Sequence, residues 1–390
     1  MIFNANFKSQ NIFIYMEDLG LKPIISVIMS SYNHEKFVSE SIKSVLNQSF
    51  KEFEFLIIDD NSCDKTLKII EEFKDPRIKV FKNKKNLGMV VNTNYLISQS
   101  KGDYIAIINS DDFWEQNKLE KQIEFLENNQ NYGVCFTTAK IVNENGQAIK
   151  NNIEDSLKYL EFDRFKFLNY FFFHNNPLCY PSALISRKVF DKNIYFNPAY
   201  IILLDIDFWI RMCLAGFEIK ILNEKLTNFR IINNGGNLSG KNNKTLVRNA
   251  LELNEIYKSY QNIKNFEDFI KIFPEYQDIS INNKNLEGYY YLIDFCYKKY
   301  FVGNFKPSEK KIRNFIIHFI HQKSFIDPDF FQKLESELSI HYSEYSNMIN
   351  KYPIGITFLY TKKIKEFKKK FLIIFLIILL LLTSKLFIQS

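Results

Sequence analysis

The chain has 390 residues, a formal net charge of +7 and a hydrophobic fraction of 46%. That hydrophobic fraction excludes general disorder, and the length allows one large domain with extensions or two domains. Much of the basic excess lies near the C-terminus and the basic glycine-aromatic motif of RNA-binding sheets does not occur, so we expect no nucleic-acid partner.

Residues 1–22 form a predicted N-terminal extension, because a regular pattern begins only at Pro23. They lack the basic start, long apolar run and small-residue cleavage site of a secretory signal peptide. Met16 is a candidate alternative start of translation.

Strand and helix patterns then alternate through the first half of the chain. Runs typical of buried strands occupy residues 24–29, 53–58, 77–81, 104–108 and 133–138. Helical spacing of apolar residues occupies residues 36–47, 65–73, 89–100 and 119–127. Asp64 can cap the second of these helices. The order predicts an α/β fold with a mainly parallel, Rossmann-like sheet and helices on both faces.

The pattern changes after residue 143. The aromatic-rich stretch 157–173 predicts either a helix of the core or a wall facing an acceptor, and the core is the simpler interpretation. Strand patterns at 180–185 and 217–222 flank a helical pattern at 207–214.

We place the main domain at residues 23–240, a mostly helical extension at 241–360, and a basic segment with an apolar run at 361–390. A helix from Phe371 to Ile388 would be roughly 27 Å long, close to the hydrocarbon thickness of a bilayer. A buried or interfacial helix is the alternative, which the lack of a polar face disfavours. Because six lysines precede the run, we predict a C-terminal membrane-anchor helix with the main domain at the cytoplasmic face of the cell membrane.

The cysteines and histidines are too scattered to predict a metal centre. The five cysteines stand at positions 63, 135, 179, 213 and 296, without a CxxC pair, and their apolar surroundings predict reduced thiols. By its position in the sequence His34 stands near the predicted nucleotide site, with an ordinary surface position as the alternative. We expect His318 and His321 on one structural face of a helix.

Acidic and small polar residues gather where three predicted strands end. They occupy residues 30–33, 59–62 and 109–112. Because the carboxyl ends of parallel strands share one edge of a sheet, these residues should meet. Two of the segments carry paired acids, whose like charges a cation compensates best. The pattern indicates a site for a nucleotide and a metal; the alternative is a solvated turn that caps the next helix.

In order and spacing, these segments and several others resemble a family 2 glycosyltransferase of the GT-A fold. The matching segments are residues 23–34, 41–50, 55–62, 86–88, 109–114, 118–122, 180–185 and 205–211, within a coverage of residues 23–235. The resemblance implies an inverting, metal-dependent enzyme that moves a sugar from a nucleotide-diphosphate sugar to a hydroxyl acceptor. It also implies a place in cell-surface glycan biosynthesis, with polysaccharide, lipooligosaccharide or lipid-linked oligosaccharide as the product.

The resemblance assigns roles to individual residues. It implies nucleotide-sugar contacts from Ser30, Tyr32, Asp60, Asn86, Gly88 and Asp111. Asp60 would accept a hydrogen bond from the base, typically uracil, so a UDP-sugar is the favoured donor. Asp111 and Asp112 would hold Mg²⁺ or Mn²⁺, hard ions that take oxygen ligands and leave coordination places for phosphates.

The resemblance also implies the catalytic base and the acceptor. Asp205 matches the base of the family's Glu-Asp motif, which would deprotonate the acceptor hydroxyl. Asp207 is the alternative base, or the N-cap of a helix that begins there. The expected acceptor is a glycan or a lipid-linked molecule, reached from the membrane through the C-terminal helix.

Four positions depart from the family's pattern. They are Asn109 in place of the first acid of the DxD motif, Thr93 in place of an arginine, Leu204 in place of an acid, and residues 230–234, which lack a histidine. These departures keep open a catalytically impaired, membrane-tethered binding partner. A nucleotidyltransferase is a weaker alternative, because the first strand is not followed by a basic glycine-rich phosphate loop. The bias toward Lys, Asn, Ile and Phe is typical of an AT-rich bacterial genome.

Overall fold

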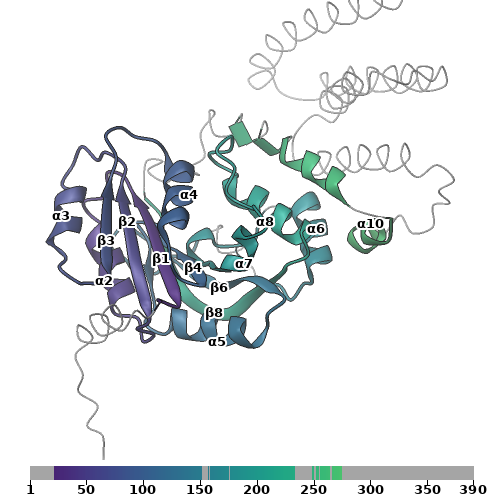
Figure 1. Cartoon of the computed structure of the whole chain (residues 1–390), viewed down its shortest axis with the longest axis horizontal. Coiled ribbons are helices and arrows are strands. Elements are labelled where there is room, and N and C mark those ends of the chain that lie inside the picture. The colour runs from purple at the N-terminus through teal and green to yellow at the C-terminus, as the bar shows by residue number, and fades with distance from the viewer. Residues whose placement is uncertain are drawn as a thin grey trace, which may run out of the picture. The chain divides into compact units, whose positions relative to one another are not determined.

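The structure is a computed structural model, shown in Figure 1. It describes residues 22–151, 157, 159–174, 176–232, 248–249, 252–253, 255–263 and 266–274. These residues all belong to the first of the two units into which the chain divides, Met1–Tyr289. The predicted N-terminal extension up to residue 21, His318, His321, most of the predicted helical extension and the predicted anchor at 361–390 lie outside the described residues.

An eight-stranded sheet forms the centre of this unit. Its strands are β1 (Ile25–Ser31), β2 (Phe53–Asp59), β3 (Ile78–Lys82), β4 (Tyr104–Ile107), β5 (Phe113–Trp114), β6 (Tyr132–Val142), β7 (Leu184–Ser186) and β8 (Glu218–Arg230). The spatial order is β3-β2-β1-β4-β7-β6-β8-β5. Strands β1 to β4 are parallel, as predicted, and β6 is parallel to β8. Strand β7 is antiparallel to both its neighbours and β5 is antiparallel to β8, so the sheet as a whole is mixed.

Helices cover both faces of the sheet (Figure 1), as the alternating pattern predicts. They are α2 (Val38–Leu46), α3 (Thr66–Glu72), α4 (Met89–Gln99), α5 (Lys118–Asn128), α6 (Arg164–Phe173), α7 (Arg187–Phe190), α8 (Leu204–Leu214) and α10 (Phe266–Ile272), with 3-10 helices η1 (Tyr180–Ser182) and η3 (Tyr257–Asn262). The alternation of side chains along β1 explains the two layers. Val27 and Met29 share a buried core with residues of α2 and α3, whereas Ser30 accepts a hydrogen bond from Asn92 of α4.

Three predicted strands have the wrong extent, and one of them, 133–138, continues as β6 to Val142. The first part of the predicted strand 180–185 is the 3-10 helix η1, because Pro181 lacks an amide hydrogen for a ladder and Ser182 N–H bonds back to the Cys179 carbonyl. The predicted strand 217–222 continues as β8 to Arg230, because β6 extends beside it to Val142. Pairing with β6 satisfies the backbone groups of this polar continuation, which a sequence pattern does not reveal.

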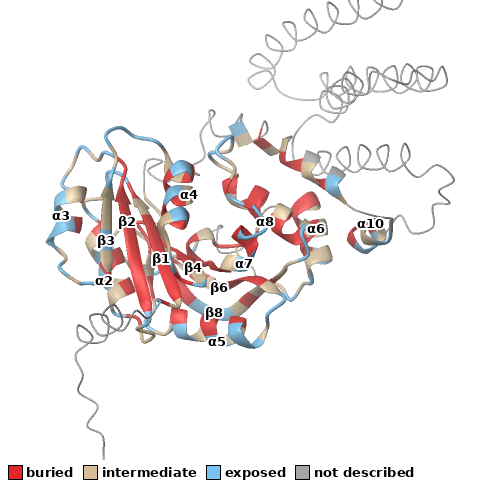
Figure 2. Ribbon diagram, in the orientation of Figure 1, coloured by how far each residue is buried: buried red, intermediate tan, exposed pale blue. Residues whose placement is uncertain are grey.

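The aromatic stretch at the start of the second half belongs to the core. Four residues of α6 are fully buried: Phe167, Leu168, Phe171 and Phe172. Beyond them, the ring of Trp209 in α8 meets that of Phe136 edge to face with centroids 4.9 Å apart. Figure 2 shows this buried layer between α6, α8 and the sheet. Among the described residues, no helix is both long enough and apolar enough to cross a membrane.

Candidate active site

The polar ends of β1, β2 and β4 meet at one edge of the sheet, as predicted. Strand β1 lies between β2 and β4, with Ser31 beside Asp59 in the parallel register. The loops after β1 and β2 are joined, because Asn33 N–H donates to Ser62 Oγ (3.0 Å) and Cys63 N–H donates to Asn33 Oδ1 (2.8 Å). The structure therefore brings the three predicted segments together at the carboxyl edge, where open α/β sheets bind ligands.

Asp60 is a buried carboxylate that accepts several hydrogen bonds. Oδ1 accepts from Asn83 Nδ2 (2.8 Å) and Leu87 N–H (2.8 Å), and Oδ2 accepts from Gly88 N–H (2.9 Å). Burial alone would raise the pKa of Asp60, but these donors outweigh it and the pKa is lowered. Gly88 has φ = +86°, a conformation that suits glycine and turns two successive N–H groups toward the same carboxylate. Asp60 is therefore ionised at neutral pH.

A chain of amides connects Asp60 to the other predicted donor residue on β1. Asn83 Nδ2 also donates to Asn92 Oδ1 (2.7 Å), and Asn92 Nδ2 donates to Ser30 Oγ (3.1 Å). Ser30, Asp60 and Gly88 thus lie in one polar cluster. Tyr32 and Asn86 are exposed at its rim.

The second acidic segment, after β4, is a tight turn in which Asp112 is buried. Its Oδ1 accepts from the backbone N–H of Arg230 (2.7 Å) and its Oδ2 from Asn109 Nδ2 (2.9 Å). Burial raises the pKa of Asp112 well above its usual range, and the charge of Asp111 raises it further. The departure at Asn109 fits this turn, because an amide donates to Asp112 where a third carboxylate would repel it.

Asp111 is also buried, and burial raises its pKa. The positive charges of His34 and Arg230 act in the opposite direction. His34 is half-buried rather than on the surface, with Nδ1 2.7 Å from Ser110 Oγ. Two adjacent carboxylates whose pKa burial raises are an electrostatic setting that a bound cation favours.

Arg230, at the end of β8, holds the acidic turn in place. Nε donates to the Asp111 carbonyl (2.7 Å), and Nη1 donates to the carbonyls of Asn143 (3.1 Å) and Glu144 (2.6 Å). Nη2 forms an ion pair with Glu40, and two phenylalanine rings cover the guanidinium. In the sequence, residues 230–234 stand out only because they lack a histidine. The role of Arg230 depends on contacts far apart in the chain and was missed.

Lys118 lies fully buried behind the acidic turn. Its ammonium group stands 3.9 Å from the centre of the Trp114 ring and donates to Gln122 Oε1 (2.7 Å). Burial lowers the pKa of Lys118 to about 7. Because Gln122 also donates to the Ser182 carbonyl (2.9 Å), this motif ties α5 to the segment before β7.

Asp205 lies in the first turn of α8. Its Oδ2 accepts from Asn176 Nδ2 (2.7 Å), and its Oδ1 accepts from the N–H of Ile206 (2.8 Å). Burial raises the pKa of Asp205 to about 6, although both hydrogen bonds lower it. A carboxylate with a pKa near neutrality can accept a proton from a hydroxyl nucleophile and remain ionised often enough to react.

Asp207, the alternative base, is already paired. Its Oδ2 accepts from Nε (2.9 Å) and Nη2 (2.6 Å) of Arg211, one turn later on α8. It is not an N-cap, because the helix begins earlier, at Leu204. Burial raises the pKa of Asp207, and Arg211 opposes the shift. The geometry favours Asp205 over Asp207 as the base.

Glu252 is a second residue that the sequence analysis missed. Its carboxylate accepts hydrogen bonds of 2.9–3.0 Å from the three successive N–H groups of residues 201–203 and pairs with Arg248. These donors precede α8, so Glu252 fixes the backbone that leads to Asp205. Its signal in the sequence is weak, because residue 252 lies in a helical pattern where acids are common.

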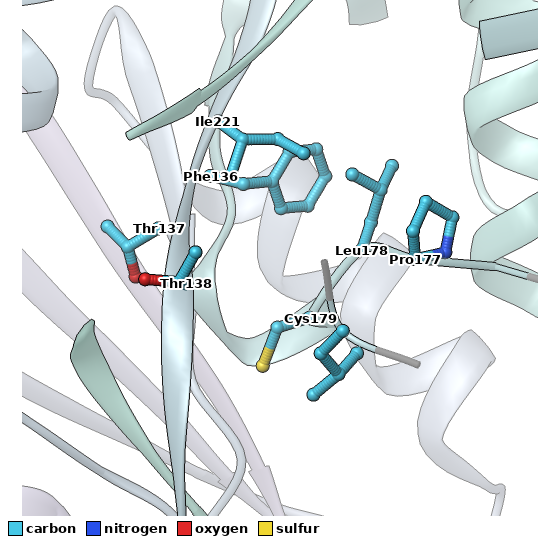
Figure 3. A pocket seen from close by; sticks show the side chains of 8 residues that line it. Phe136, Thr137, Thr138, Pro177, Leu178, Cys179 and Ile221 are labelled. Carbon is cyan, nitrogen blue, oxygen red and sulfur yellow. The ribbon is translucent and has the colours of Figure 1, made fainter. Parts of the chain in front are cut away.

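A small pocket is lined in part by residues 177–179, which directly follow Asn176, the hydrogen-bond partner of Asp205 (Figure 3). Its lining residues are Phe136, Thr137, Thr138, Leu157, Pro177, Leu178, Cys179 and Ile221. Burial raises the pKa of the Cys179 thiol, and the charges of Asp112 and Asp205 raise it further.

Comparison with known proteins agrees with this geometry. Residues 26–194 match the profile of the family described as Glycosyl transferase family 2. An uncharacterized glycosyltransferase of Methanocaldococcus jannaschii is 35% identical over 222 residues, which cover 56% of this chain and 74% of the relative. The Escherichia coli protein WfaP, named a UDP-Glc:alpha-D-GlcNAc-diphosphoundecaprenol beta-1,3-glucosyltransferase, is 29% identical over 241 residues, or 60% of this chain and 86% of WfaP.

Among solved structures, residues 1–349 of S. aureus TarS in complex with UDP-GlcNAc superpose with a TM-score of 0.52 and 21% identity. The superposition covers 70% of this chain and 80% of the TarS chain. This likeness concerns the fold.

Proposed function

This chain belongs to glycosyl transferase family 2, and on that premise we propose that it transfers a sugar with inversion onto a hydroxyl of a cell-surface glycan precursor. Its donor is a nucleoside-diphosphate sugar, with a UDP-sugar favoured. The name of the relative WfaP describes transfer from UDP-Glc to a diphosphoundecaprenol-linked sugar. By extension, we propose a lipid-linked or growing glycan acceptor for this chain.

The observation that carries the proposal is the meeting of the polar ends of β1, β2 and β4 at one edge of the sheet. Asp205, on α8, is held by Asn176, and burial raises its pKa to about 6. Asp60 is ionised and fixed by backbone N–H groups. Sugar transfer requires a base that takes the proton of the acceptor and a fixed carboxylate that binds the nucleotide.

The proposed reaction is one displacement at the anomeric carbon. A new bond forms between the acceptor oxygen and the anomeric carbon while the bond from that carbon to the β-phosphate oxygen breaks. The acceptor proton moves to the Asp205 carboxylate, and the bonding electrons leave with the nucleoside diphosphate. Asn176 keeps the carboxylate oriented toward the hydroxyl by holding Oδ2.

The acidic turn has the chemistry of a site for Mg²⁺ or Mn²⁺. Asp111 and Asp112 are adjacent carboxylates, and burial raises the pKa of both. We propose both as ligands of the ion, since a carboxylate oxygen that accepts one hydrogen bond keeps a second lone pair. When bound, the ion would neutralise charge on the leaving diphosphate. The described residues contain no group of three or more His, Cys, Asp or Glu placed around one point, so phosphate oxygens and water complete the proposed ligand set.

Asp60 is proposed to recognise the base of the donor. Oδ2 accepts from Gly88 N–H, and a carboxylate oxygen has two lone pairs, so it can accept a further N–H such as that of uracil. Ser30 and the exposed ring of Tyr32 border the same cluster and are proposed to contact the nucleoside.

Attachment to the cytoplasmic face of the cell membrane through residues 361–390 remains part of the proposal, because the apolar run and its lysines predict it. Deleting residues 371–390 should release the chain from isolated membranes in high salt, which also screens any contact made through lysines. Continued sedimentation of the truncated chain with membranes would show that another part of the molecule is sufficient for attachment.

The function is tested by nucleoside-diphosphate release from a panel of UDP-, GDP- and dTDP-sugars, with membrane lipid extract as acceptor, with and without Mn²⁺. We expect metal-dependent release from one donor and a loss of at least about 100-fold in Asp111→Asn. Asp191→Asn, a change of an exposed acid, is the matched control and should act as wild type. If the wild-type chain releases nucleoside diphosphate from none of the donors, the result would favour the alternative that this chain is a catalytically impaired binding partner.

A further inference from the structure

A long stretch beside the donor cluster is basic and free of acids. Residues 76–102 contain five lysines and one arginine, and neither Asp nor Glu. This stretch includes β3, the loop that supplies Leu87 and Gly88 to Asp60, and α4. Since acids and bases are nearly balanced in the chain as a whole, the stretch carries a local excess of positive charge.

The outer face of α4 carries an apolar ridge. Val91 and Tyr95, four residues apart, lie on one side of the helix, and Leu87 stands in the loop just before it. They are 42%, 42% and 41% exposed. The opposite side of α4 packs on the sheet, and Figure 2 shows its exposed and buried faces. Helix α4 contains no charged residue, so the ridge is not interrupted by charge.

Exposed lysines border this ridge. Lys84 and Lys85 lie in the loop before α4, and the ammonium of Lys79 on β3 stands 5.0 Å from the centre of the Phe81 ring. Lys82 instead pairs with Glu71 of α3. The ridge and β3 are in contact, because the ring of Tyr95 meets that of Phe81 edge to face with centroids 5.3 Å apart. Strand β3 is an edge of the sheet, so this side of the molecule is open along both elements.

We propose that the surface formed by Leu87, Val91, Tyr95 and lysines 79, 84 and 85 binds a bilayer that contains anionic lipids. Lysines attract anionic headgroups, and apolar side chains beside them can enter the headgroup layer, with a tyrosine ring at the interface. A nucleic acid fits this surface less well, because leucine and valine do not stack on bases. A second copy of the chain would bring the same lysines face to face without acids to pair them.

The position of this surface would bring a bound bilayer close to the donor cluster. Leu87 belongs both to the ridge and to the loop that binds Asp60, so a bilayer on the ridge would lie next to the donor cluster. If the proposed function holds, this contact brings a lipid-linked acceptor to the edge of the site. The membrane contact itself does not require sugar transfer, so the two proposals can fail separately.

The contact is tested on the full chain with an environment-sensitive fluorophore at Val91→Cys, in a background with Cys63→Ser and Cys296→Ser. A probe at Lys68→Cys on α3, which packs on the other face of the sheet, is the control. Vesicles consist of phosphatidylcholine, alone or with about one third phosphatidylglycerol. We expect a blue shift at position 91, quenched by brominated lipid, only with anionic vesicles, and no shift at position 68.

Charge reversal separates this surface from other contacts with lipid. Lys84→Glu with Lys85→Glu should lower the affinity that the probe at position 91 reports by at least roughly 30-fold. Lys65→Glu with Lys68→Glu, the same charge change on exposed residues near α3, should leave it within about threefold. An unshifted probe at position 91 on vesicle-bound protein would overturn the proposal. A shift that depends on protein concentration without vesicles would assign the surface to a second copy and would overturn it equally.

Discussion

Replacing Asp205 by asparagine removes a negative charge from a half-buried side chain and keeps the shape of that side chain. The pKa of Asp205 is raised by burial from 3.8 to about 6, so the folded state holds the proton more tightly than the unfolded state does. By linkage, the carboxylate then lowers the stability of the fold as the pH rises between these two values. The substitution should therefore stabilise the fold at neutral pH while it removes the proposed base.

The magnitude follows from the two pKa values. The raised pKa of Asp205 lowers the free energy of unfolding by roughly 3 kcal/mol at pH 8. At pH 5, where Asp205 is mostly protonated in the folded state, the loss is roughly 1.5 kcal/mol. Asparagine has one acceptor oxygen for the two donors, Asn176 and Ile206, so one hydrogen bond of about 1 kcal/mol is lost. The net gain in the free energy of unfolding is about 2 kcal/mol at pH 8 and about 0.5 kcal/mol at pH 5.

Urea unfolding at both pH values, followed by tryptophan fluorescence, measures this gain, and diphosphate release measures the activity. We expect Asp205→Asn to be more stable than wild type at pH 8, to bind donor normally, and to lose transfer by at least about 1000-fold. Asp191→Asn, at an exposed position, should change neither quantity. Retained transfer, or an equal change in stability at pH 5 and pH 8, would refute the assignment of Asp205 as a base with a raised pKa.

The remaining predictions concern the acidic turn, the core behind it and the pH dependence of the reaction. Asp111→Asn should abolish the effect of Mn²⁺ on donor binding in isothermal titration calorimetry, and unchanged binding would contradict the metal assignment. Arg230→Ala should lower the free energy of unfolding by about 3 kcal/mol in urea, because it leaves buried carbonyls and the acidic turn without their donor. Lys118→Met should stabilise the fold more at pH 6 than at pH 9, because burial lowers the pKa of Lys118 from 10.5 to about 7 and disfavours its charged form most at low pH. The kcat/KM of wild type should rise with pH through about 6 and then level off as Asp205 ionises, and a flat profile between pH 5 and 8 would contradict its role.

The sequence predicts the donor side of the site well because local patterns determine it. Each acid stands directly after a strand, and parallel neighbours bring such positions to one edge. Asp60 and Asp111 could therefore be placed together without knowledge of any side-chain contact. The same logic predicts the helices on both faces, since α2 and α4 each connect two strands of a parallel unit.

The supports of the site could not be predicted, because they join residues that are distant in the chain. The N–H of Arg230 reaches Asp112 only because β8 continues beside β6 to its end. Glu252 reaches residues 201–203 across about fifty positions of sequence. Such contacts leave no periodic signal, and an isolated Arg or Glu in a polar segment reads as a solvated residue.

The measurement that tests the central claim most directly is the anomeric configuration of the product. The identified donor, with ¹³C at its anomeric carbon, is incubated with wild-type enzyme and acceptor, and the new linkage is read by NMR. Single displacement with Asp205 as base predicts that an α-linked donor gives a β-glycoside and that Asp205→Asn gives none. An α-glycoside, or equal product from Asp205→Asn, would contradict the account.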